Sequence, residues 1–377
     1  MPLDPHLPPS VRLPTVEERF LGCLLGGAVG DALGAPVEFL SRAEILRRFG
    51  PSGITDCAKA YGGLGRITDD TQMTLFTAEG LLRAWVRGCF KGITTYTGVT
   101  AHAYLRWLKT QGEQSPLEAS LHGEPGWLIG QDALHHRRAP GMTCLKALRD
   151  MPALGRPACN DSKGCGGVMR VAPVGLFLSR LGQANAVGEA FALGTDLAAL
   201  THGHPTGSLT GGVLAALILA LIEGAGLQAA IAAAKVPLQK APHSEETLHA
   251  IEQAEALARS DLPPAQAIAR LGEGWVAEEA LAIALYCALV APDLEQAVIL
   301  AVNHDGDSDS TGAIVGNLLG AVHGVQAIPE RWLAPLELRE VIAELAQDLH
   351  DFRGWRIGEY SQELALNERI WRKYPGY

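Results

Sequence analysis

GCLLGGAVGDALG, residues 22–34, carries glycine at every fourth position: Gly22, Gly26, Gly30 and Gly34. A step of four residues keeps side chains on nearly the same face of a helix, and a face without side chains lets a second backbone approach unusually closely. Because glycine inside a helix costs roughly 0.5 to 1 kcal/mol relative to alanine, such a row requires a compensating contact. The segment therefore predicts a helix that packs closely against another backbone.

The same four-residue step occurs in two further segments of the chain. These rows consist of Gly203, Gly207 and Gly211, and of Gly312, Gly316, Gly320 and Gly324. Since each row removes side chains from one helix face, we predict that the three helices pack together in the centre of the molecule.

The rest of the chain is also helical in pattern. From Thr15 onward, Ala and Leu recur at spacings of three and four, while alternating β-branched stretches are scarce. We therefore predict an all-α fold with a compact single domain over residues 15–377. Residues 1–14 hold five prolines and read as an extended N-terminal tail. Two segments interrupt this helical pattern. We expect loops over residues 109–166 and a surface helix over residues 236–265.

Composition and charge exclude some classes of protein. The net charge of −10 disfavours non-specific nucleic-acid binding through a cationic surface. Seven cysteines without a C-x-x-C pair, and no signal-peptide pattern, predict a reducing cytoplasmic location. The apolar run GVLAALILALI, residues 212–222, is shorter than the ~20 residues of a membrane span. We expect a buried helix there and no membrane partner.

Acidic and hydroxyl residues stand directly before an apolar helical pattern in ITDDTQMTLF, residues 67–76. Asp69 and Asp70 lie there between Thr68 and Thr71. One reading is N-capping, because Asp, Ser and Thr are common at helix starts. Capping needs only one side-chain oxygen, however, and this segment offers several.

A second acidic cluster lies in NHDGDSDSTGAIVG, residues 303–316, ahead of the third glycine row. Its aspartates are Asp305, Asp307 and Asp309. The cluster is not an EF-hand, because the sixth and twelfth places hold Ser310 and Gly316. If the two helix starts meet, their carboxylates must either take up protons or bind a hard divalent cation such as Mg²⁺, Mn²⁺ or Ca²⁺.

Two other segments hold candidate binding residues. In NDSKGCGGVMRVAP, residues 160–173, glycines expose backbone N–H groups beside a serine and a lysine, which suits either a phosphate site or a glycine-rich turn. THGHP contains His202 and His204. Two histidines without a third partner favour a structural or substrate-contacting role over metal ligation.

Together these motifs resemble those of the ADP-ribosylglycohydrolase family, in the family's order, from about residue 20 to 330. The matching segments are GCLLGGAVGDALGAPVEFL, ITDDTQMTLF, NDSKGCGGVMRVAPVGL, THGHPTGSL and GDSDSTGAIVGNLLGA. The resemblance implies an all-α domain with a central cleft that holds two divalent cations, Mg²⁺ or Mn²⁺.

The resemblance also implies site residues. The implied metal ligands are Thr68, Asp69, Asp70, Asp307, Asp309 and Ser310. The implied catalytic residues are Glu38, Asp307 and Asp309, and the substrate-binding residues are Ser162, Lys163, Gly164, Cys165, Gly166 and His202. Ser310 stands where the family commonly has threonine, and a serine keeps the hydroxyl oxygen. Pro36 should end the first glycine-row helix, so that Glu38 lies in the mobile loop that follows.

The activity implied by the resemblance is hydrolysis of the glycosidic bond between ADP-ribose and an acceptor. The partners are then an ADP-ribosylated protein or a small ADP-ribosyl substrate, with ADP-ribose as product. Two alternatives stay open: a metal-bound ADP-ribose binder without turnover, and a hydrolase of a free ADP-ribose derivative or of ADP-ribosylated nucleic acid. The segment 137–145 lacks an acidic residue, which disfavours an arginine acceptor, and Arg137 and Arg138 could instead meet an acidic target.

Overall fold

The computed structural model describes residues 12–117 and 125–376 of the chain. These residues form α-helices, short 3-10 helices and loops, with no β-strand among them, which confirms the all-α prediction. The helices surround one continuous hydrophobic core, so the described chain is a single domain. Most of the predicted N-terminal tail, residues 1–11, lies outside the described residues.

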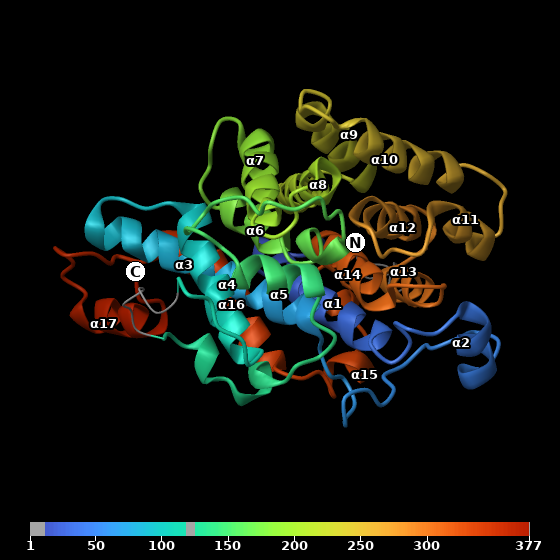
Figure 1. Ribbon diagram of the computed structural model, residues 1–377, viewed down its shortest axis with the longest axis horizontal. Coiled ribbons are helices and arrows are strands. Elements are labelled where there is room, and N and C mark those ends of the chain that lie inside the picture. Colours follow the sequence, from blue (N-terminus) through green and yellow to red (C-terminus); the bar gives the residue numbers. More distant parts are fainter. Residues whose placement is uncertain (1–11, 118–124, 377) are drawn as a thin grey trace, which may run out of the picture.

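Largely buried helices form the centre, and the other helices surround them (Figure 1). The central helices are α1 (Val16–Gly34), α3 (Asp69–Lys91), α8 (Pro205–Ile222), α12 (Ala277–Val290) and α14 (Ser308–His323). The surrounding helices are α2 (Arg42–Phe49), α4 (Tyr96–Thr110), α5 (Met142–Arg149), α6 (Ala172–Ser179), α7 (Ala186–Ala199), α9 (Leu227–Leu238), α10 (Glu245–Ala258), α11 (Pro264–Leu271), α13 (Leu294–Val302), α15 (Glu330–Leu333), α16 (Arg339–Asp351) and α17 (Leu364–Lys373). The 3-10 helices are η2 (Leu128–Gly130), η3 (Asp132–His135), η4 (Cys165–Gly167), η5 (Val325–Ala327) and η6 (Phe352–Gly354).

The first and third glycine rows pack against each other, as predicted. Helices α1 and α14 lie side by side and run in opposite directions (Figure 1). The facing pairs are Gly22 with Gly320, Gly26 with Gly316, and Gly30 with Gly312. A Cβ atom on any of these glycines would overlap the backbone of its partner helix. The antiparallel direction places the start of α14 beside the end of α1.

The second glycine row lies on and just before α8, which contacts α14 and α1 as predicted, but its glycines face other partners. Gly211 on α8 faces Ala198 and Gly194 of α7, while Gly207 faces the backbone of Ser162. A four-residue step predicts a close backbone approach but does not specify which backbone approaches. Helix α8 is apolar and long enough to span a membrane by length and composition, but 94% of it is buried within the described fold, which confirms the predicted core helix.

The structure agrees in part with the two predicted interruptions of the helical pattern. Helix α10 lies inside 236–265 and has one exposed face, as expected. The segment 109–166 is mostly loop and 3-10 helix where it is described, but it contains α5, which was not predicted. Helix α5 forms because Cys144, Leu145 and Leu148 share one buried face at helical spacing.

Candidate active site

The two acidic helix starts meet at the end of α1. Gly34, the last residue of α1, lies directly against the backbone of Ser308 and Asp309 at the start of α14. Three residues before Gly34, Asp31 accepts hydrogen bonds from the N–H of Thr68 and so holds the start of α3. The glycine packing therefore brings together two segments that are about 240 residues apart in the chain.

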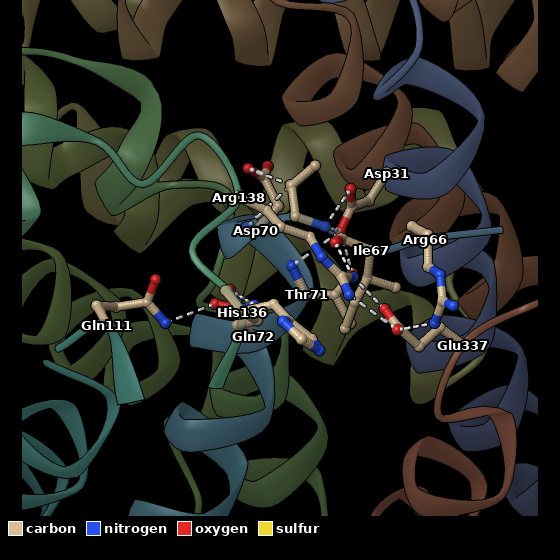
Figure 2. A network of polar contacts seen from close by, with 11 residues as sticks. Asp31, Arg66, Ile67, Asp70, Thr71, Gln72, Gln111, His136, Arg138 and Glu337 are labelled. Carbon is tan, nitrogen blue, oxygen red and sulfur yellow. Dashed lines mark hydrogen bonds and ion pairs between the residues drawn. The ribbon is translucent and has the colours of Figure 1, made fainter. Parts of the chain in front are cut away.

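Asp31 is a functional residue that the sequence reasoning missed. Its carboxylate is fully buried and accepts hydrogen bonds from the N–H of Thr68, at 3.0 Å to each oxygen, and from the N–H of Thr71 at 3.1 Å. The Thr71 hydroxyl also donates to it, and Figure 2 shows the two side chains together. Burial, with repulsion from Asp309, raises the pKa of Asp31 to about 7. The signal that the sequence offered for Asp31 was a charged residue within a run of small apolar residues.

All six implied metal ligands are buried, each with less than 5% of its surface exposed. Capping accounts for part of their geometry. The Thr68 hydroxyl accepts from the N–H of Asp70 at 3.3 Å, and Asp307 accepts from the N–H of Ser310 at 3.2 Å. Asp69 instead accepts from the N–H of Gly141 at 3.1 Å, which ties the loop before α5 to the cluster.

The cluster concentrates negative charge. Burial raises the pKa values of Asp69, Asp70, Asp307 and Asp309, and mutual repulsion adds to the rise for Asp69, Asp70 and Asp309. The buried Oδ1 of Asp70 has no hydrogen-bond partner. Carboxylates in this state are strongly stabilised by a proton or a cation.

Glu38 faces the same carboxylates. It lies in the turn that follows α1 and Pro36, as expected, but only 6% of it is exposed. Burial, followed by repulsion from Asp309 and other carboxylates of the cluster, raises the pKa of Glu38 to about 11. Its Oε2 has no hydrogen-bond partner. In this arrangement Glu38 is protonated at neutral pH.

The donor chemistry fits a hard divalent cation. The cluster offers carboxylate and hydroxyl oxygens, which Mg²⁺ and Mn²⁺ prefer, and the unpartnered Asp70 oxygen is a free donor atom. In the described part of the chain, however, no group of three or more His, Cys, Asp or Glu side chains is arranged so that it could hold an ion. The thiol of Cys165 donates to Asp307 at 2.8 Å.

The implied substrate-binding loop lies beside the acidic cluster. The N–H of Cys165 donates to the carbonyl of Trp275, and the hydroxyl of Ser162 pairs with that of Thr143 at 3.1 Å. The Lys163 ammonium is already paired with two carboxylates, Glu246 and Glu278. It therefore does not present a free positive charge to a phosphate in this arrangement.

His202 lies beneath that loop. A Cβ atom at Gly166 would come within 3.1 Å of the His202 ring, so the glycine is required for this contact. Only 2% of His202 is exposed, and burial, together with Arg170, lowers its pKa to about 3, so the ring is neutral. His204 instead caps α8, with its ring nitrogen accepting from the N–H of Thr206. The two histidines therefore have separate roles.

A cavity of about 320 Å³ opens beside Ser162. Its lining includes the polar or basic residues Thr143, Lys146, Arg156 and Asn160, and also Asp150, which pairs with Lys146. The carboxylates of the acidic cluster do not line it. The glycine-rich loop thus separates a small cavity with basic residues from a buried acidic cluster.

Arg138 is paired internally, which contradicts the expectation that it meets an acidic target, whereas Arg137 stays about half exposed. Arg138 is buried, donates to the carbonyl of Ile67 at 2.8 Å and pairs with Glu337 (Figure 2). Arg137 pairs with Glu113. Arg138 thereby fixes the loop whose N–H group holds Asp69.

Comparisons with known proteins match most of this chain. A family model described as ADP-ribosylglycohydrolase matches residues 12–357. An uncharacterized protein of Archaeoglobus fulgidus is 30% identical over 89% of this chain and 97% of its own. The ADP-ribosyl-[dinitrogen reductase] glycohydrolase of Rhodospirillum rubrum is 28% identical over 86% of this chain and 92% of its own. A solved structure named ADP-ribosylglycohydrolase-related protein complex is 29% identical, with a TM-score of 0.57, and covers 89% of this chain and 98% of its own.

Proposed function

The chain belongs to the ADP-ribosylglycohydrolase family, as its five motifs indicate, and we propose that it is a divalent-cation-dependent hydrolase that releases ADP-ribose from an acceptor. The observation that carries the proposal is the convergence of two helix starts whose buried carboxylates repel one another. Such a cluster is costly in a folded protein unless it binds positive charge.

Six residues would hold the cations, three from each helix start. They are Thr68, Asp69 and Asp70 before and in α3, and Asp307, Asp309 and Ser310 before and in α14. When bound, divalent cations would orient ribose hydroxyls, lower the pKa of a water molecule and stabilise charge as the glycosidic bond breaks. Asp31 would hold Thr68 and Thr71 in place from α1 without contacting substrate.

Glu38 would exchange a proton with the reacting groups. Its carboxyl group is buried, has one oxygen without a hydrogen-bond partner and carries a proton in the cation-free site. A carboxylic acid with a raised pKa can protonate the departing acceptor while the ribose passes through an oxocarbenium-like state. Asp307 and Asp309 would position the water that attacks the anomeric carbon.

The ADP half of the substrate would occupy the cavity beside Ser162 and the loop over His202. The cavity has room for part of a nucleotide, and Arg156 and Asn160 supply cationic and polar groups suited to a diphosphate. Lys146 would reach a phosphate only by leaving Asp150. Lys163 would reach phosphate only by leaving Glu246 or Glu278. The neutral ring of His202 would support the loop at Gly164 and Gly166.

A single assay tests the proposal. Purified protein is incubated with Mg²⁺, Mn²⁺ or a chelator, and with an ADP-ribosyl-arginine peptide, an ADP-ribosyl-serine peptide or ADP-ribosylated DNA. We expect cation-dependent release of ADP-ribose from at least one of them, detected by chromatography, and none by the Asp309→Ala variant. Tight binding of ADP-ribose without release from any substrate would instead identify a non-catalytic binder.

A further inference from the structure

Two exposed aromatic rings stack beside the site and take no part in the chemistry proposed above. Phe39 directly follows Glu38 and is 70% exposed, and Trp275 is 39% exposed. Their ring centroids are 5.8 Å apart and their planes are inclined by 18°. A single exposed phenylalanine is ordinary. Phe39, however, stacks on Trp275. The segment around Trp275 is hydrogen-bonded both to the start of α14 and to the substrate-binding loop.

The segment 272–277, here called the Trp275 loop, is fixed by backbone hydrogen bonds. The carbonyl of Glu273 accepts from the N–H of Asp307 at 2.8 Å, at the start of α14. The carbonyl of Trp275 accepts from the N–H of Cys165 at 3.2 Å, in the substrate-binding loop. The Trp275 loop therefore offers a rigid support next to the acidic cluster.

The segment 35–40, here called the Glu38 turn, is fixed at its ends. Its first N–H donates to the carbonyl of Asp31 at 2.9 Å, and just beyond it the N–H of Arg42 donates to Asp305 at 2.8 Å. Between these points, Glu38 is turned into the protein and Phe39 is turned outward. The stack on Trp275 thus joins the tip of the turn to the Trp275 loop.

We propose that Phe39 and Trp275 form an aromatic clamp that keeps the Glu38 turn closed over the acidic cluster. Both are positioning residues, because they act on the reaction through Glu38. Glu38 is buried with one carboxyl oxygen that has no hydrogen-bond partner, which opposes the closed position, so a contact that offsets this cost is needed. The effect on turnover rests on the proposed hydrolase function, whereas the closure itself does not.

Hydrogen exchange measured by mass spectrometry tests the clamp without any substrate. The N–H of Val37 donates to the carbonyl of Gly34 and that of Leu40 to the carbonyl of Val37, so both report opening of the Glu38 turn. We expect Phe39→Ala and Trp275→Ala to raise exchange there about three- to ten-fold, which is the equilibrium factor that an aromatic pair typically contributes. Phe39→Tyr keeps a stacking ring and should restore slow exchange.

Ile93→Ala is the matched control, because Ile93 is also 70% exposed and lies in the connection between α3 and α4. It should leave exchange in the Glu38 turn unchanged. Unchanged exchange in Phe39→Ala, in a variant with wild-type thermal stability, would overturn the clamp. An equal increase in Ile93→Ala would do the same.

Kinetic measurements distinguish a failure of the clamp from a failure of the proposed function. If the wild-type protein is a hydrolase, Phe39→Ala should lower kcat about three- to ten-fold at nearly unchanged KM, and Phe39→Tyr should recover it. If the wild-type protein releases no ADP-ribose, the proposed function fails while the exchange measurement still decides the clamp. Faster exchange with unchanged kcat in an active enzyme would overturn the positioning role.

Discussion

Both carboxylate oxygens of Asp31 accept a hydrogen bond from the N–H of Thr68, each at 3.0 Å. Asp31 directly follows Gly30, which packs against Gly312 of α14. One short stretch of α1 therefore sets the position of α14 through its glycines and the position of α3 through its carboxylate. The geometry of the acidic cluster depends on this shared support.

Replacing Asp31 should destabilise the protein and weaken the cluster together. Asp31→Ala would leave the buried N–H groups of Thr68 and Thr71 without an acceptor, at about 1–3 kcal/mol each. The substitution also removes a buried negative charge, which offsets part of this loss. The stabilities of the two proteins should therefore be compared near pH 5, where Asp31 is mostly protonated. Urea unfolding should show a net loss of about 2 kcal/mol or more. Wild-type stability at that pH would contradict the support role.

Removing Asp309 should weaken cation binding. Its charge contributes to the raised pKa values of Asp31, Glu38 and Asp70, so it lies at the electrostatic centre of the cluster. In calorimetric titrations with Mn²⁺, Asp309→Ala should lose at least about tenfold in affinity, or about 1.4 kcal/mol. Asp307→Asn should also bind more weakly.

Asp261→Ala serves as the matched control for these titrations, because it removes one negative charge from an exposed loop. It should bind Mn²⁺ as the wild type does. Equal affinities for the wild type and Asp309→Ala would exclude Asp309 from the cation site.

The stability of the cation-free protein should fall as the pH rises. The pKa of Asp31 is about 7 in the folded protein, against an ordinary value of 3.8, so the folded state binds more protons between these values. Stability is therefore lost as the pH rises through this window, and the carboxylates with raised pKa values add to the trend. With a chelator present, Tm should be higher near pH 5 than near pH 8 by about 3 °C or more.

Saturating Mn²⁺ should raise Tm more near pH 8 than near pH 5, because protons and cations compete for the same carboxylates. A chelated protein whose Tm increases from pH 5 to pH 8 would contradict the electrostatic account of the site.

The α1–α14 contact should tolerate no added methyl group. In Gly316→Ala, the new Cβ would overlap the carbonyl of Gly26. Because backbone rather than a flexible side chain obstructs it, we expect destabilisation at or above about 3 kcal/mol, the upper end for overpacking. Gly130→Ala, where no atom lies within 4 Å of the added Cβ, should change the urea midpoint little. Similar midpoints for the two variants would refute the close backbone approach.

The Arg138–Glu337 pair should stabilise the site from outside the cluster. In Arg138→Met, the buried Glu337 would keep Arg66 as its only ion-pair partner. The carbonyl of Ile67 would lose the hydrogen bond that Arg138 donates. Breaking a buried pair typically costs about 3–5 kcal/mol. We therefore expect lower stability and weaker Mn²⁺ binding, because the loop that donates to Asp69 is loosened. The double variant Arg138→Met/Glu337→Leu should recover stability, and a failure to recover would argue against a pairwise effect.

The sequence predicted the parts of the site that have local signals. Acidic residues ahead of apolar helical patterns marked the starts of α3 and α14, and Pro36 marked the turn that carries Glu38. It could not assign the second glycine row to α7 or Arg138 to Glu337. Asp31 was also missed, although it lies in the first glycine-row motif, and so was the Trp275 loop, which carries no motif of its own.

The sequence by itself determined the helical class, the demand for a close backbone contact at the glycine rows and the chemistry of the acidic helix starts. These follow from residue type and from spacing within one or two helical turns, which fix local conformation and donor atoms. Tertiary structure alone decided which backbones meet, that Asp31 supports α3, and that Phe39 stacks on Trp275. Each of these contacts joins residues from separate segments, and shape and charge complementarity in the packed core selects the partner.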